Sequence, residues 1–199
     1  MNLERVLILI DGGNIYSALY KEKEDSLGNK IAPLLPKGFK FDYKKFCEYL
    51  ANGREIIAIR YYIGIVRNTD GTSKSELMVL GQQKFLAKLE NAGIKIERGR
   101  VVYDHGKTRE KGVDVKIAID IVIEGYENTY DSVIIISSDS DLIPAVKYIV
   151  TKKKKVEYIG FQNHYSTALI NECSTQRVLA GQDLQQFELS EEEAVDSAE

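Results

Sequence analysis

The stretch that decides the fold is RVLILIDGGN, residues 5–14. It contains a run of Leu and β-branched residues, Val6 to Ile10, with no polar residue inside it. Such a run is typical of a strand in a parallel sheet, because helices cover both faces of that sheet and every side chain is buried. The run ends at Asp11, and the two glycines that follow allow a tight turn of the backbone. The stretch therefore predicts an α/β fold with a carboxylate at the end of a central strand.

The rest of the chain alternates between strand-like and helix-like patterns. Further strands are expected at residues 55–66, 94–103, 132–137 and 155–160. Helices are expected at residues 13–20, 42–51, 73–92, 113–125, 141–151 and 165–173. Residues 104–112 (DHGKTREKG) are expected to form a charged loop, and residues 178–189 fit neither pattern. This alternation predicts a three-layer α/β/α sandwich around a mostly parallel sheet.

The size and composition of the chain favour one domain. With 199 residues, 44% of them hydrophobic, it can bury a real core, and we expect a single domain over residues 1–187. Residues 188–199 contain six acids and no base, and they predict an acidic, disordered tail. The whole chain has a net charge of -3, but without these six acids 27 basic residues stand against 24 acidic ones. A mildly basic body permits a polyanionic partner but does not identify one.

Two further features bear on the compartment. Cys47 and Cys173 have neither the spacing of a metal site nor the number of a disulfide scaffold, which indicates a reducing environment. The apolar run from Val6 to Ile10 is too short for a signal peptide or a membrane span. We therefore expect a soluble, cytoplasmic protein without a membrane partner.

Acidic residues follow two of the expected strands. Asp11 ends the first, and IIISSDSDLIP (residues 134–144) places Asp139 and Asp141 just beyond another. Two carboxylates this close repel each other unless a cation or hydrogen bonds hold both ionised. Ligands of parallel sheets gather at the carboxyl ends of the strands, where the strand order changes direction. If the two strands flank that point, Asp11 and Asp139 meet in one crevice.

Asp114 adds an acid from a helix start. Carboxylates are also ordinary residues at the beginning of helices, so simple capping stays an alternative for Asp114 and Asp139. Asp120 lies roughly 240° around the same helix from Asp114, so we expect it to serve as a supporting or structural acid. Asn14 could present an amide oxygen or donor to the same crevice.

The acids together suit a hard dication. Mg²⁺ prefers oxygen ligands, often one or two carboxylates with retained waters. Bound beside a phosphodiester, it can orient a water and neutralise charge in the transition state. His105 and His164 have no metal-ligand spacing, and the sequence assigns neither a functional role.

Three segments carry a resemblance to a known family: LILIDGGNIY (7–16), KGVDVKIAIDI (111–121) and VIIISSDSDLIPAVKYI (133–149). They resemble the signature segments of the NYN domain, the PIN-like ribonuclease branch that includes the LabA-like proteins, over roughly residues 4–160. The resemblance implies a PIN-like fold and an endoribonuclease that depends on Mg²⁺ or Mn²⁺. It implies the following catalytic residues, of which the four aspartates are the metal ligands: Asp11, Asn14, Asp114, Asp139 and Asp141.

One residue departs from the family pattern. The family has Ser-Gly-Asp-Ser-Asp where this chain has Ser138 in place of the glycine. We expect the serine side chain to crowd the approach to the metal slightly, without removing any carboxylate.

RNA contacts are expected around the acids. Lys107, Arg109 and Lys111 precede Asp114 and could meet phosphates, and Tyr16 on the first helix could stack with an unpaired base. Single-stranded RNA is the expected substrate, because its splayed bases can be reached by side chains. The basic run Lys152 to Lys155 is expected at the opposite end of the sheet, since strands and helices run in opposite directions.

Other functions stay open from the sequence. A non-catalytic module that binds RNA or a protein is the main alternative, motivated by Ser138 and the modest charge. A DxD-type phosphatase is disfavoured because Gly13 stands two residues after Asp11. A dinucleotide-binding dehydrogenase is disfavoured because DGGNIYSA does not match GxGxxG, and no P-loop is present. The sequence leaves the oligomeric state open.

Overall fold

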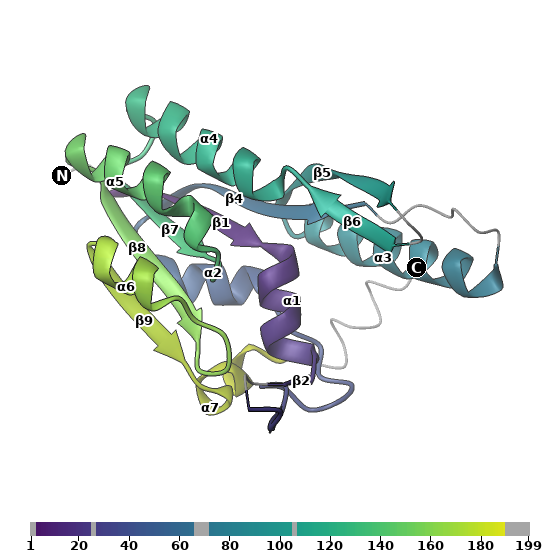
Figure 1. The fold of residues 1–199 in the computed structure, drawn as a ribbon. Coiled ribbons are helices and arrows are strands. Elements are labelled where there is room, and N and C mark those ends of the chain that lie inside the picture. The colour runs from purple at the N-terminus through teal and green to yellow at the C-terminus, as the bar shows by residue number, and fades with distance from the viewer. Residues whose placement is uncertain (1–2, 25–26, 66–71, 105–106, 190–199) are drawn as a thin grey trace.

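The computed structural model describes residues 3–24, 27–65, 72–104 and 107–189, and for residues 100–104 and 107–111 it describes the backbone alone. Within these residues one seven-stranded sheet forms the centre of the molecule (Figure 1). Its strands follow one another across the sheet in this order: β6 (Lys107–Lys111), β5 (Lys95–Asp104), β4 (Glu55–Gly64), β1 (Arg5–Asp11), β7 (Ser132–Ile136), β8 (Lys155–Phe161) and β9 (Thr175–Leu179). All neighbours pair in parallel except β5 and β6. The predicted mostly parallel sheet is confirmed.

Strand β1 is buried on both faces, as its sequence predicts. Each residue from Val6 to Ile10 is at most 1% exposed. Val6, Ile8 and Ile10 enter the core on one face of the sheet, while Leu7 and Leu9 enter the core on the other. Because successive side chains of a strand point to opposite faces, only an uninterrupted apolar run can fill both cores.

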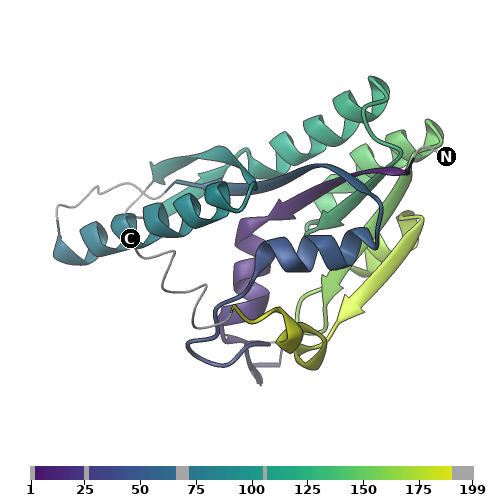
Figure 2. The same cartoon turned by 180° about the vertical axis from the view of Figure 1, so that it is seen from behind.

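Helices cover both faces and complete the predicted three layers. The helices that share a core with Val6, Ile8 and Ile10 are α1 (Gly12–Tyr20), α2 (Tyr43–Ala51), α3 (Ser73–Asn91) and the short α7 (Gly181–Leu184). The helices on the other face are α4 (Val113–Tyr126), α5 (Ile143–Thr151) and α6 (Thr167–Glu172). Figure 1 shows α4, α5 and α6 in front of the sheet. Figure 2, the view from behind, shows α2 and α3 on the opposite face of the sheet. Among the described residues, no helix combines the length and apolarity that crossing a bilayer requires.

Several short elements were not predicted. They are β2 (Lys23–Glu24), β3 (Lys30–Ile31), β9, and the 3₁₀ turns η1 (Ser140–Leu142) and η2 (Gln185–Phe187). The prediction of a loop at residues 104–112 is wrong, because most of this segment forms β6. Strand β6 pairs antiparallel with β5, from Asp104↔Lys107 to Arg100↔Lys111. The sequence of β6, KTREK, has no apolar alternation, so this strand is specified by pairing with β5 rather than by a pattern of its own.

The strand order changes direction between β1 and β7. From β1 the chain builds β4 and β5 on one side, and later adds β7, β8 and β9 on the other. The register pairs Ile10 with Ile136, so the residues that follow, Asp11 and Ser137, lie side by side at the carboxyl edge. The predicted crevice at the switch point therefore lies at the ends of β1 and β7.

The first two residues of the predicted acidic tail are attached to the fold. Glu188 forms an isolated bridge with Phe41, and the Leu189 amide donates to the carbonyl oxygen of Lys40 at 2.9 Å. The remaining part of the predicted acidic tail, residues 190–199, lies outside the described residues.

Candidate metal centre and active site

Asp11 is the last residue of β1 and caps α1. The Asn14 amide donates to Asp11 Oδ1 at 3.0 Å, and Asp11 Oδ2 accepts from Asn14 Nδ2 and from Ser137 Oγ, the latter at 3.0 Å. The side chain is 6% exposed. Burial raises the pKa of the Asp11 carboxyl, hydrogen bonds from Asn14 and Ser137 lower it, and the negative charge of Asp139 raises it further. The carboxylate of Asp11 thus ties β1, α1 and β7 together beside Asp139.

Three other carboxylates form a close acidic group. Asp114, Asp139 and Asp141 each offer one oxygen, and these oxygens all lie within 4.8 Å of one another. Asp139 comes from the loop after β7, Asp141 from η1 and Asp114 from the first turn of α4. The Asp141 amide donates to Asp139 Oδ1 at 2.9 Å, so Asp139 also caps η1. Both readings of Asp139, as a cap and as a member of an acidic cluster, therefore hold in the structure.

Local backbone geometry leaves Asp114 free to face this group. The N-cap of α4 is Gly112, whose φ of 79° is the left-handed conformation that glycine adopts readily, and no side chain caps this helix end. The carboxylate of Asp114 is therefore not used as the cap of its own helix. Helix α4 packs against both α5 and η1, which brings Asp114 to Asp139 and Asp141.

The donor set of this group fits a hard dication. All three donors are carboxylate oxygens, the ligands that Mg²⁺ and Mn²⁺ prefer, with no Cys or His among them to favour Zn²⁺. Across the side chains that the structure describes, no ion pair joins a base to Asp114, Asp139 or Asp141. A dication held between these carboxylates would relieve their mutual repulsion.

Asp11 is not part of this group. The structure brings together three of the four predicted metal ligands. In the fourth, Asp11, Oδ1 accepts from the Asn14 backbone amide and Oδ2 accepts from the side chains of Asn14 and Ser137. Asp11 nevertheless lies close enough for the charge of Asp139 to act on its pKa. A direct bond from Asp11 to a metal stays a prediction.

A second network, formed by Asn14, Ser138 and His164, lies next to Asp11. Asn14 Oδ1 accepts from the Ser138 amide at 3.3 Å, from Ser138 Oγ, and from His164 Nε2 at 2.8 Å. His164 Nε2 also lies 2.6 Å from Ser138 Oγ. Because Asn14 Oδ1 can only accept, Nε2 of His164 carries a proton. The Ser138 hydroxyl thus faces Asn14 and His164, and the expectation that it crowds the approach to the metal stays a prediction.

His164 is the residue of this region that the sequence did not suggest. It lies in the turn after β8, and β8 is the neighbour of β7, so His164 reaches the same carboxyl edge of the sheet. Burial lowers the pKa of His164, and the positive charge of Lys23 lowers it further. The strand-end rule that selected Asp11 and Asp139 would also have selected His164 if it had been applied to β8.

The other predicted residues lie in different places. Asp120 pairs with Arg60 at 3.0 Å and accepts from the Tyr62 hydroxyl at 2.6 Å, which makes it a structural acid. Tyr16 is 49% exposed, and its ring centroid lies 5.5 Å from that of Tyr20.

The basic residues fall into two sets. Lys107, Arg109 and Lys111 belong to β6, where only the backbone is described, and His105 lies outside the described residues. The run from Lys152 to Lys155 leads into β8, whose first residue pairs with the first residue of β7, so this run lies at the opposite edge of the sheet as predicted.

Comparison with known proteins agrees with this geometry. The family model of the NYN domain matches residues 5–180, a span that contains every residue of the acidic group. The chain belongs to the NYN domain family. NYN domains have a PIN-like fold and are generally nucleases, so membership places this chain in a nuclease family.

Two solved structures are similar to this NYN domain. A protein of unknown function from Vibrio parahaemolyticus RIMD 2210633 aligns with a TM-score of 0.67 and 20% identity, over 94% of this chain and 98% of that one. That similarity supports the fold. A pyrazinamidase/nicotinamidase from Streptococcus mutans UA159 aligns with a TM-score of 0.35 and 14% identity, over 88% of this chain and 100% of that one, and we draw nothing from it. No curated protein matches the chain.

Proposed function

We propose that this NYN domain is a metal-dependent endoribonuclease that hydrolyses phosphodiester bonds of single-stranded RNA. The observation that carries the proposal is the acidic group of Asp114, Asp139 and Asp141 at the switch point of a PIN-like sheet. Asp11 and Asn14 complete the proposed catalytic set, and Asp11 is proposed as a fourth metal ligand. The cofactor is Mg²⁺ or Mn²⁺, because the group offers oxygen ligands alone.

The residues of the site have separate tasks in this proposal. Asp114, Asp139 and Asp141 would hold the dication, which when bound supplies an activated water and neutralises phosphate charge. Asp11 adds negative charge behind Asp139, and Asn14 holds Asp11 through its side-chain amide. Ser137 fixes the loop after β7, since its hydroxyl donates to Asp11 and accepts from the Asp139 amide at 3.1 Å.

RNA is proposed to approach over α1 and β6. Tyr16 is exposed, and the ammonium group of Lys21 lies 5.3 Å from the centre of its ring, which combines a stacking surface with a positive charge. Lys107, Arg109 and Lys111 are proposed phosphate contacts. We also infer that the protein acts in the cytoplasm, because both cysteines are free thiols.

The direct test is cleavage of a circular single-stranded RNA by the purified protein. With Mg²⁺ or Mn²⁺ we expect linear products, since only an endonuclease can open a circle, and with EDTA we expect none. A circle that stays intact with both metals, at protein concentrations that bind RNA, would contradict the proposal.

Metal binding is expected to stabilise the fold measurably. At a Mn²⁺ concentration about 100 times Kd, the free energy of unfolding should rise by about 2.7 kcal/mol. For a chain of this length that corresponds to an increase in Tm of about 5–10 °C. Differential scanning fluorimetry measures it, and Asp141→Asn should abolish most of the increase. Titration calorimetry without dication binding at millimolar concentrations would instead favour the non-catalytic RNA- or protein-binding module.

Replacing Ser138 with glycine is expected to affect stability more than activity. The serine hydroxyl contacts Asn14 and His164 rather than the acidic group. Its loss should lower the free energy of unfolding by about 1–2 kcal/mol, through lost hydrogen bonds and the greater chain entropy of glycine. RNA cleavage should stay within about threefold, because the hydroxyl is not one of the oxygens that would hold the dication. A large gain in cleavage by Ser138→Gly would show that the serine obstructs the site.

A further inference from the structure

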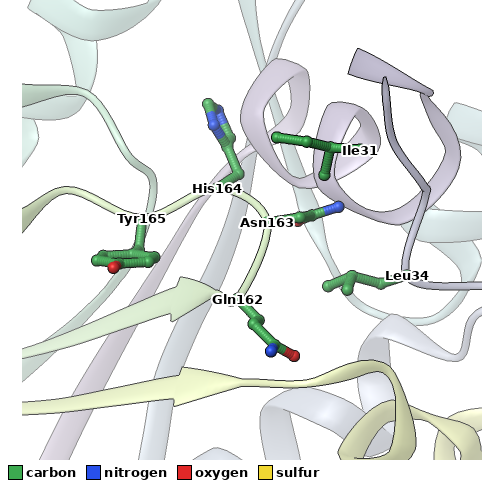
Figure 3. Close-up of a pocket in the computed structure, with 6 residues that line it drawn as sticks. All are labelled: Ile31, Leu34, Gln162, Asn163, His164 and Tyr165. Atoms are coloured by element: carbon green, nitrogen blue, oxygen red, sulfur yellow. The ribbon is translucent and has the colours of Figure 1, made fainter. Parts of the chain in front are cut away.

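A pocket lies directly beside the proposed active site. Its volume is about 450 Å³, within the usual range for small-ligand sites. Figure 3 shows the six residues that line it: Ile31, Leu34, Gln162, Asn163, His164 and Tyr165. His164 belongs both to this pocket and to the network with Asn14, so a single side chain separates the pocket from the residue that holds Asp11.

The wall between the pocket and α1 is held in place by hydrogen bonds. Asn163 Nδ2 donates to the carbonyl oxygens of Ala18 at 2.9 Å and Ala32 at 3.2 Å. The Leu34 amide also donates to the Ala18 carbonyl at 3.2 Å, which ties the segment after β3 to α1. The turn after β8 is closed by a pair of backbone hydrogen bonds between Phe161 and His164. A ligand therefore meets a preformed site, which lowers the entropy that binding costs.

The lining combines apolar surface with free polar groups. Ile31 and Leu34 face the turn from one side, and Tyr165, 49% exposed, lies at its other end (Figure 3). Gln162 and His164 point in opposite directions from the turn. The side-chain amide of Gln162 is exposed and makes no hydrogen bond to the residues that the structure describes. Apolar walls, an aromatic ring and an amide that can donate and accept are the features that bind a nucleobase.

The charge near His164 suits a polyanionic strand. Burial lowers the pKa of His164 and the positive charge of Lys23 lowers it further, and burial followed by the charge of Lys21 lowers the pKa of Lys23. No ion pair of Lys21 or Lys23 occurs among the described residues. Lys21 is exposed, whereas the ammonium group of Lys23 is buried, so Lys21 is the base that a backbone phosphate can reach.

We propose that this pocket receives the base of an unpaired nucleotide in the RNA strand bound at the acidic group. The inference rests on the proposed function and deepens it by assigning a subsite. A base inside a duplex is stacked and paired, so it cannot enter the pocket, whereas a base of single-stranded RNA can turn into it. The pocket would therefore supply the proposed preference for single strands, which the carboxylates alone do not provide.

Methyl NMR tests the location. Adding adenosine or uridine 5′-monophosphate to the full chain in EDTA should shift the methyl resonances of Ile31 and Leu34, because a base ring placed beside them changes their local field. The methyl groups of Leu77, which is 70% exposed on α3, serve as the control and should not shift. Unchanged Ile31 and Leu34 resonances at saturating nucleotide concentrations would overturn the proposal.

Variants of Tyr165 test the contribution of the ring. Tyr165→Ala should weaken binding of a short fluorescein-labelled single-stranded RNA by about tenfold, as expected for one lost stacking contact, while Tyr165→Phe should bind as the wild type does. Tyr126→Ala, at a more exposed tyrosine at the far end of α4, should change nothing. Equal binding by Tyr165→Ala and the wild type would count against the subsite.

These measurements separate the two proposals. Binding in EDTA depends on neither the metal nor cleavage. A protein that cleaves RNA but shows no shift at Ile31 and Leu34 keeps its proposed function and loses the subsite. A protein that shows the shifts but never cleaves keeps the subsite and loses the nuclease assignment.

Discussion

Asp139→Asn should reduce metal-dependent RNA cleavage by about 100-fold or more. Asp139 contributes one of the three oxygens of the acidic group, and the stabilisation that a bound dication gives to a phosphoryl transition state amounts to several kcal/mol. The fold should survive, because asparagine is as good an N-cap as aspartate and its side-chain oxygen can still accept from the Asp141 amide. Initial rates of cleavage, measured at saturating Mn²⁺ with Tm as the check on folding, give the result.

Asp42→Asn provides a matched control for this variant. Asp42 caps α2 in the same way, since its Oδ1 accepts from the Lys45 amide at 2.9 Å, but it does not belong to the acidic group. Its cleavage rate and Tm should equal those of the wild type. If Asp139→Asn cleaves RNA as fast as Asp42→Asn, the activity comes from a contaminant or from another site, and the acidic group is not the metal centre.

The architecture of this site was predictable because parallel sheets obey a simple rule. The apolar run of β1 predicts a strand buried on both faces, and the alternation of elements predicts a parallel sheet. The carboxyl ends of neighbouring strands meet at one edge, so Asp11 and Asp139 were expected to lie close together, and the pairing of β1 with β7 confirms it. These steps depend on periodicity and chain direction, which can be read from sequence.

The hydrogen-bond partners of each carboxylate oxygen could not be predicted in the same way. The sequence shows which strand ends carry acids, but the hydrogen bonds from Asn14 and Ser137 to Asp11 depend on side-chain positions that only the folded chain defines. The strand-end rule could have placed His164 at this edge, but its contact with Asn14, across 150 positions of sequence, could not be read from any local pattern. The edge strands β6 and β9 were missed for a related reason, since edge strands are specified by the neighbour with which they pair.

Gly12→Ala is expected to lower the free energy of unfolding by about 3 kcal/mol, which is more than a typical surface substitution does. Gly12 is the first residue of α1, directly after Asp11, where β1 turns into the helix beside β4. A Cβ at this position would lie 2.7 Å from the carbonyl oxygen of Tyr62 and would also overlap the ring of Tyr61. The Tyr61 ring is buried against Tyr43 and Phe85, and the carbonyl belongs to the paired backbone of β4, so the start of α1 must move. Overpacking of this kind costs about 1–3 kcal/mol, and backbone obstruction favours the upper end.

Gly81→Ala gives the comparison that isolates this clash. Gly81 lies inside α3, and a Cβ there meets no atom within 4 Å. Alanine should therefore stabilise α3 by about 0.5–1 kcal/mol, because it restricts the unfolded chain more than glycine does. Urea denaturation of both variants measures the difference. Since a shift of α1 also moves Asn14 away from Asp11, Gly12→Ala should lose RNA cleavage as well, while Gly81→Ala should retain it. A Gly12→Ala protein as stable as the wild type would mean that the turn after β1 can widen, and that Asp11 is less firmly placed than its hydrogen bonds indicate.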